Sequence, residues 1–165
     1  MADVHDKKTR SRNMAAIKGK NTKPEIWLRK ELFKIGFRYR LHRKDLPGKP
    51  DIVLPKYRAV IFVHGCFWHG HQGCPLFRIP STRTEFWKEK ISSNRHRDSR
   101  NIAKLHELGW RVLELWECSI KGKLRLDGHT LIQSASEWIR GSDAEAEISG
   151  LDSPNSIIKD FDSRK

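Results

Sequence analysis

The sequence predicts an α/β fold in which helices cover the faces of a mixed central β-sheet. Helical and strand patterns follow one another in the order helix, three strands, irregular loop, helices, strand, helix. The length of 165 residues is that of one domain with a single core. A hydrophobic content of 37% excludes wholesale disorder. We therefore expect one domain over residues 1–140.

The first elements are helical. Residues 7–20 are basic and predict a short helix that orders on a surface or a ligand. Thr22 to Glu25 form a capping box with a proline in the first turn, which predicts a helix ending near Ile35. Gly36 would stop this helix, and its inward residues would be Leu28, Leu32 and Ile35.

Three strands are expected next. Residues 37–42 alternate apolar and polar side chains, which predicts a half-buried strand. Residues 51–54 form a short strand, and the β-branched run 59–63 a buried one. Residues 64–80 contain Gly, Pro, Cys and His without a period, so this segment reads as an irregular loop that needs something to hold it.

The second half of the chain is expected to be mainly helical. A second capping box, Thr82 to Glu85, starts a helix through Ile91, and a further helix spans about 94–108. A strand at 110–116 and a helix at 129–139 complete the domain. Residues 141–165 are rich in Ser and Asp and are expected to be a flexible tail.

The charge indicates a polyanion as partner. The formal net charge is +13, and residues 1–50 alone carry +10. A basic front on a compact domain is typical of nucleic-acid binding, and a membrane surface is the weaker alternative. The chain has no apolar run long enough to span a bilayer and no secretory signal at its start. We expect a soluble, cytoplasmic protein.

Cysteine and histidine spacing predicts a metal site. Cys66, His71 and Cys74 lie in the irregular loop, and Cys118 follows a strand. Three thiolates and one imidazole are a tetrahedral zinc ligand set, which would staple the loop to the sheet. His69 or His64 would be alternatives to His71, and three unrelated buried cysteines are the plainer interpretation.

A second chemistry is indicated by an aspartate and two further histidines. Asp51 opens a strand in a basic protein, where a carboxylate suits Mg²⁺, although a solvated loop aspartate is the more common case. His64 and His69 offer a general base or a phosphate contact, and Asp98 would orient one of them. The alternative is that these histidines serve zinc or the surface.

Aromatic residues accompany these groups. Phe67 and Trp68 lie inside the irregular loop, and Trp87 lies on the following helix beside lysines. They are either core residues or wedges that unstack base pairs.

Together these motifs closely resemble the very short patch repair (Vsr) endonucleases. The resemblance rests on Pro50-Asp51, on Phe62-Val63-His64-Gly65-Cys66-Phe67-Trp68-His69, on Thr82 to Trp87, and on Gly109 to Leu113 with Trp116-Glu117-Cys118. It extends to the opening residues and covers about residues 1–140. It implies a variant of the PD-(D/E)xK nuclease fold, in which Phe62 and His64 replace the usual Glu and Lys.

The resemblance also implies a role for each site residue. Asp51 and the backbone carbonyl of Val63 would bind Mg²⁺, His69 would be the general base oriented by Asp98, and His64 would contact the phosphate. Glu25 would lie near the metal waters, a role that competes with its capping function. The zinc ligands would be Cys66, His71, Cys74 and Cys118, and the side chains entering the base stack would be Phe67, Trp68 and Trp87. The segment before Cys74 is one residue longer than the family pattern, so a reshaped zinc loop is expected.

The function implied is a Mg²⁺-dependent endonuclease that nicks 5′ to the T of a T·G mismatch arising from 5-methylcytosine deamination. Its partner would be double-stranded DNA clamped by residues 1–20, and the family acts as a monomer alongside mismatch-repair proteins and a repair DNA polymerase. Two alternatives stay open: a restriction-type nuclease that cuts matched duplex, and a zinc-stapled DNA-binding module without catalysis.

Overall fold

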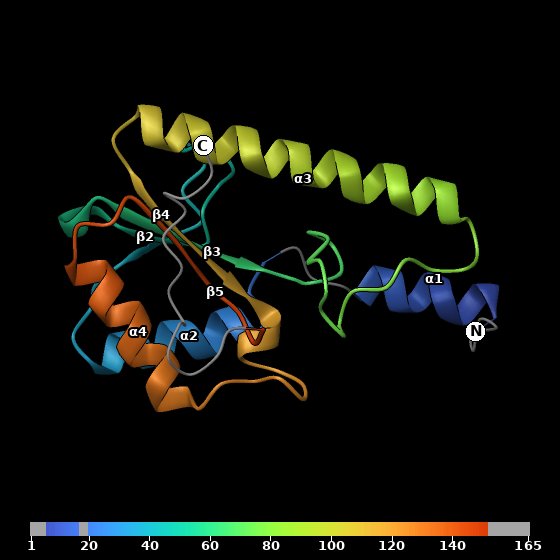
Figure 1. Cartoon of the computed structure of the whole chain (residues 1–165), viewed down its shortest axis with the longest axis horizontal. Coiled ribbons are helices and arrows are strands. Elements are labelled where there is room, and N and C mark those ends of the chain that lie inside the picture. The colour runs from blue at the N-terminus through green and yellow to red at the C-terminus, as the bar shows by residue number, and fades with distance from the viewer. Residues whose placement is uncertain (1–5, 17–19, 152–165) are drawn as a thin grey trace.

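The computed structural model describes residues 6–16 and 20–151, which form one five-stranded sheet with helices on both faces (Figure 1). The strand order follows the chain, β1-β2-β3-β4-β5. The β1-β2 and β2-β3 pairs are antiparallel, and β3-β4 and β4-β5 are parallel. The strands are β1 Arg40–Leu41, β2 Ile52–Leu54, β3 Ala59–His64, β4 Arg111–Trp116 and β5 Glu145–Ile148. The predicted mixed α/β sheet is confirmed.

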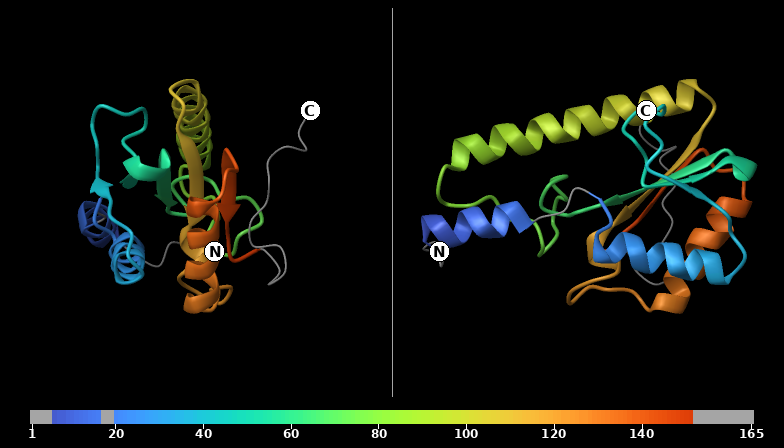
Figure 2. Two further views of the ribbon diagram at one scale, coloured as in Figure 1. Left: turned by 90° about the vertical axis from the view of Figure 1, so that its left-hand side faces the viewer. Right: turned by 180° about the vertical axis from the view of Figure 1, so that it is seen from behind.

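The helices form two layers. One face is covered by α2 (Lys23–Lys34) and α4 (Gly128–Arg140), and the other by the long helix α3 (Thr84–Glu107), as the end-on view in Figure 2 shows. Helix α1 (Lys7–Ala16) extends beyond the same end of the sheet as the loop that follows β3. Short 3₁₀ turns, Pro55–Tyr57 and Glu117–Ser119, follow β2 and β4.

Each face of the sheet has its own apolar core. Leu28 and Leu32 of α2 pack with α4 and with the strand side chains that point to that face, including Ile61 and Leu113. On the opposite face, α3 packs against the alternate side chains of the strands. Because strand side chains alternate, this second face also receives Asp51, His64 and Glu114.

Helix α2 follows the prediction closely. The Thr22 hydroxyl accepts from the Glu25 backbone N–H, and the helix ends at Lys34 with Ile35 as its cap. Leu28 and Leu32 are fully buried, but Ile35 is 42% exposed, so its predicted inward position is wrong. The helix ends before Ile35 can turn toward the sheet. The strand expected at 37–42 is also shorter, because only Arg40 and Leu41 pair with β2.

The two helices predicted between residues 82 and 108 are a single one. Helix α3 runs without a break through Ser92 and Ser93. The Asn94 amide donates to the Trp68 carbonyl at 2.9 Å, so a tertiary contact occupies the polar residue that the sequence suggests as a helix start. The predicted capping box is wrong as well, because the N-cap is Arg83, with φ of +56° and no side-chain cap.

Part of the expected tail belongs to the sheet. Residues 145–148 form β5, which pairs in parallel with β4, and Ala146 and Ile148 are fully buried. Glu145 and Glu147 alternate with these two residues, and in a segment rich in polar side chains they hide the strand pattern. The expectation of a tail beginning at residue 141 is therefore wrong for this strand, and residues 152–165 lie outside the described part of the chain.

Among the described residues, no helix combines the length and the apolar character needed to cross a bilayer.

Candidate active site and metal centre

The predicted site residues gather where β3 and β4 end, on the α3 side of the sheet. Asp51 precedes β2, and the antiparallel register with β3 brings its carboxylate to the backbone N–H of Val63, which donates to Oδ2 at 2.7 Å. His64 ends β3 opposite Trp116 of β4. The sheet therefore places a carboxylate next to the backbone of Val63 and beside an imidazole.

The Asp51 carboxyl is suited to a cation. Its pKa is raised to about 6, chiefly by burial and also by Glu25, against the lowering effects of the Val63 N–H, His64 and Arg29. Its second oxygen, Oδ1, makes no hydrogen bond within residues 6–16 and 20–151. Oxygen ligands of this kind are what Mg²⁺ prefers, and a bound cation would offset the cost of ionising a buried carboxyl.

Glu25 serves the helix start and the site together. Its Oε2 accepts from the Asn21 N–H at 2.9 Å, and its Oε1 from the Thr22 hydroxyl at 3.3 Å. The same side chain is 3% exposed and lies with His42 and Asp51 in a group whose ligand atoms are within 4.8 Å of one another. The two roles that seemed to compete are compatible, because the helix start itself borders the site.

His69 and Asp98 form an acid–imidazole dyad. His69 Nδ1 lies 2.6 Å from Asp98 Oδ2, which links the loop to α3. A carboxylate only accepts, so Nδ1 donates and Nε2 keeps its lone pair. Burial lowers the pKa of His69, and nearby His64 lowers it further, which outweighs the opposing effect of Asp98. The geometry is that of an oriented, neutral base.

His64 has a different environment. It is 4% exposed, and its Nε2 lies 3.1 Å from Glu114 Oε2. At this distance the two groups interact electrostatically, without forming a hydrogen bond. Burial lowers the pKa of His64, but Glu114, Asp98 and Asp51 together outweigh it and raise the pKa. The ring centroid lies 4.1 Å from that of His69.

Solvent reaches the dyad through a cavity. It has a volume of about 350 Å³ and is lined by His69, Asp98 and Glu114. Asp51 is not among the residues that line this cavity.

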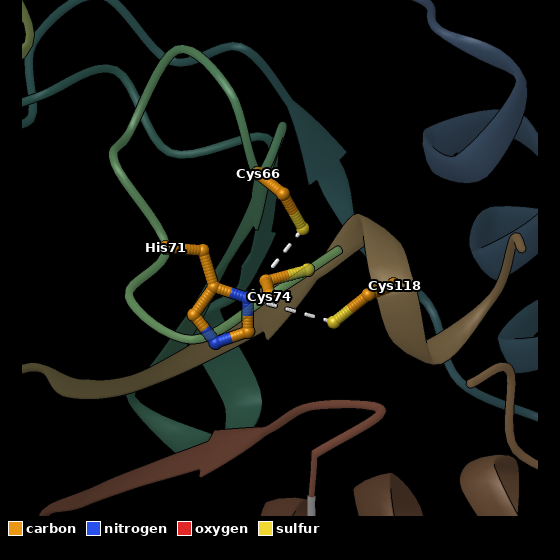
Figure 3. A group of neighbouring side chains, drawn as sticks. All are labelled: Cys66, His71, Cys74 and Cys118. Carbon is orange, nitrogen blue, oxygen red and sulfur yellow. Dashed lines mark hydrogen bonds between the residues drawn. The ribbon is translucent and has the colours of Figure 1, made fainter. Parts of the chain in front are cut away.

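The four predicted zinc ligands form a buried cluster (Figure 3). His71 Nδ1 lies 3.6 Å from Cys66 Sγ and 3.5 Å from Cys118 Sγ, and the ligand atoms of all four residues are within 4.8 Å of one another. The extra residue before Cys74 therefore leaves His71 inside the cluster. This donor set is able to hold a metal ion.

The thiols of the cluster differ in acidity. The pKa of Cys118 is lowered to about 4 by a hydrogen bond from Cys66, and also by His71 and the Gly150 N–H. The bond to Cys118, together with burial, raises the pKa of Cys66. A thiolate that accepts from a backbone N–H, as Cys118 does from Gly150, is a suitable ligand for a thiophilic cation.

Phe67, Trp68 and Trp87 form one aromatic cluster. Their ring centroids lie 5.2 to 5.8 Å apart in edge-to-face arrangements, and all three side chains are only partly buried. The loop and the start of α3 project beyond the sheet, so this cluster stands outside both cores.

Three residues near the site were not predicted. Arg29 and His42 contact Glu25, and Glu114 contacts His64. Only Arg29 carried a sequence signal, since it lies one helical turn after Glu25. His42 and Glu114 reach the site through strand pairing and chain reversal, which a linear pattern does not show.

Comparison with known proteins agrees with these motifs. A family model described as DNA mismatch endonuclease Vsr matches residues 2–75. The chain is 52% identical over 148 residues to the DNA mismatch endonuclease Vsr of Escherichia coli (strain K12), which covers 90% of this chain and 94% of that protein. The chain belongs to the Vsr family.

Further relatives extend this assignment. Identity to the Type II nicking enzyme V.XorIIP of Xanthomonas oryzae is 53%, covering 65% of this chain and 78% of the relative. Identity to V.NmeAIP of Neisseria meningitidis is 49%, covering 74% and 87%. Membership of the Vsr family makes the chain a DNA endonuclease, as the sequence predicted.

Proposed function

We propose that this member of the Vsr family is a Mg²⁺-dependent endonuclease that nicks one DNA strand 5′ to the T of a T·G mismatch. The observation that carries the proposal is the convergence of Asp51 with the His69–Asp98 dyad around His64, inside a chain that is 52% identical to a mismatch endonuclease. Asp51 and the Val63 carbonyl would hold the Mg²⁺, and the arrangement supports a variant of the PD-(D/E)xK fold. When bound, the ion would polarise the scissile phosphate.

The side chains then have separate tasks. Nε2 of His69 accepts a proton from the attacking water, and Asp98 fixes the ring and balances its charge. His64, paired with Glu114, presents a cationic ring to the phosphate and stabilises developing negative charge. The two imidazoles are adjacent, but opposite pKa shifts assign them different roles.

The other groups support substrate binding. Zinc in the Cys66, His71, Cys74 and Cys118 cluster would hold the loop that carries His69, Phe67 and Trp68. Phe67, Trp68 and Trp87 would enter the base stack, and a mismatched pair costs less to unstack than a matched one. Residues 1–20 would clamp the DNA. Mismatch-repair proteins, a repair DNA polymerase and a monomeric state stay predictions from the resemblance.

A nicking assay tests the proposal. Labelled duplexes with a single T·G pair in varied flanking contexts are incubated with the protein, beside matched duplexes, with Mg²⁺ and without it. We expect one nick beside the T, only with Mg²⁺. Asp51→Ala should abolish it, and Asp98→Asn should slow it about 10²–10⁴-fold, because the base loses its orientation.

A control variant separates catalysis from general damage. Asp143→Asn changes an exposed aspartate between α4 and β5 and should nick like the wild type. Cutting of both strands in matched duplex would replace the proposal with a restriction-type nuclease. Tight binding without cutting in any context would leave a zinc-held binding module.

A further inference from the structure

Arg29 lies between two of the three donor groups beside Asp51. Its Nη2 is 2.9 Å from Glu25 Oε2 and 3.0 Å from His42 Nε2. Glu25, His42 and Asp51 are close enough together to hold an ion, but one guanidinium nitrogen already bonds two of them. The acceptor atoms of Glu25 and His42 are therefore directed at the guanidinium of Arg29, a cation of the chain itself.

This cation is permanent. A guanidinium keeps its charge at any pH the protein meets and has donors only. His42 Nε2 must therefore accept from Arg29, which uses the ring lone pair that a metal would need. Glu25 is 3% exposed, and Arg29 neutralises it at a place where an unpaired carboxylate would be costly.

The guanidinium is also held in place. Arg29 lies one turn after Glu25 on α2, and its side chain is 12% exposed. The Tyr39 hydroxyl donates to the Arg29 backbone carbonyl at 2.9 Å, which ties this turn of the helix to the segment leading into β1. Among the described residues Asp51 forms no ion pair, and Arg29 and His64 act on its carboxylate only at longer range.

We infer that Arg29 takes the place of a second metal ion, so that the site binds one divalent cation at Asp51 and excludes another at Glu25 and His42. The inference rests on the proposed function, which assigns Mg²⁺ to Asp51. Beyond that function, the inference specifies that one ion binds and that Arg29 sets this number. Glu25 then acts as the partner of Arg29 and as an acceptor for water, without ligating the cation.

Manganese binding tests the inference. Mn²⁺ replaces Mg²⁺ at oxygen sites, and titration of the zinc-loaded full chain, followed by calorimetry and by the electron paramagnetic resonance of free Mn²⁺, counts the bound ions without DNA or turnover. We expect one ion in the wild type. Arg29→Met, which keeps the side-chain length and removes the charge, should bind two. Lys30→Met, an exposed neighbour on α2 with the same change in charge, should bind one.

A second variant covers the case in which Arg29→Met fails to fold. His42→Gln, which keeps an acceptor for Arg29, should leave the affinity for the single ion within about twofold, because His42 is not a ligand; a loss of about tenfold or more would overturn the inference. Two ions in the wild type, or one in a folded Arg29→Met, would also overturn it while leaving the proposed function intact. Absence of Mn²⁺ binding, or binding that Asp51→Asn does not weaken, would overturn both.

Discussion

His64 and His69 have ring centroids 4.1 Å apart, yet their surroundings shift their pKa values in opposite directions. Burial lowers the pKa of both. At His64, the carboxylates of Glu114, Asp98 and Asp51 raise the pKa by more than burial lowers it. At His69, Asp98 raises the pKa by less than burial and the neighbouring His64 lower it. The two neighbouring imidazoles thus differ in acidity, a difference that the residue type alone does not specify.

Asp51 makes stability depend on pH at the scale of a single residue. Its pKa in the folded protein is about 6, above the ordinary value of 3.8, so the folded state binds the Asp51 proton more tightly than the unfolded state. The stability that this proton contributes is present at low pH and is lost as the pH rises through 6. Without added Mg²⁺, the free energy of unfolding of the wild type should fall relative to Asp51→Asn by about 2–3 kcal/mol between pH 4 and pH 7.5.

Denaturant unfolding of both proteins at the two pH values measures this difference. Comparing the wild type with Asp51→Asn cancels the effect of acid on the cysteine cluster, which is the same in both proteins. Asp143→Asn should follow the wild type. An Asp51→Asn curve parallel to the wild type would contradict the burial argument.

At the scale of elements, the segment between β3 and α3 depends on its tertiary contacts. It has no regular structure between His64 and Thr84, and it is tied down at the cysteine cluster, at the His69–Asp98 pair and at the bond from Asn94 to Trp68. This segment carries His69 and two members of the aromatic cluster, Phe67 and Trp68. Its order is therefore a condition for the site.

Removing one cysteine should loosen this segment. Cys74→Ser should lower the bound zinc below one ion per chain, lower Tm by about 5–10 °C, and speed proteolysis between β3 and α3, because a structural metal contributes directly to folding. Metal analysis, thermal unfolding and limited proteolysis measure these three effects. Gln72→Ala, an exposed change in the same loop, is the control. Full zinc content in Cys74→Ser would show that this thiol is not a ligand.

At the scale of the whole molecule, basic charge extends beyond the sheet. Helix α1 and the first half of α3 both project past the strands on the side of the loop (Figure 1). Their exposed basic residues include Lys7, Lys8 and Arg12 on one helix and Lys88 and Arg95 on the other. DNA approaching the aromatic cluster would therefore meet positive charge from both helices.

The salt dependence of DNA binding measures the part of α1. Replacing Lys7, Lys8 and Arg12 by alanine should reduce the slope of log K against log salt by about 0.9 for each phosphate that the variant no longer neutralises, or roughly 2–3 in total. Fluorescence anisotropy with one labelled duplex at several salt concentrations gives the slope. Mn²⁺ binding should not change. An unaltered slope would place α1 outside the DNA interface.

The sequence by itself determined the local elements and the ligand types. The Thr22 cap and the apolar spacing predict α2 because both signals lie in the helix or directly before it. The run at 59–63 predicts β3 because its residues are apolar and largely β-branched, and its first four are buried in succession. The metal cluster was predictable because chemistry restricts it to Cys and His. The family resemblance connected Asp51, His69 and Asp98, which spacing alone does not.

The tertiary structure decided the rest. Strand β5 forms because β4 offers a partner edge, and α3 stays continuous because Trp68 receives the Asn94 amide. Parallel pairing of β3 with β4 places Glu114 on the face that carries His64, and α2 directs Arg29 at the donors beside Asp51. These contacts join residues far apart in the chain, and their free energy arises from burial and charge that exist only after folding.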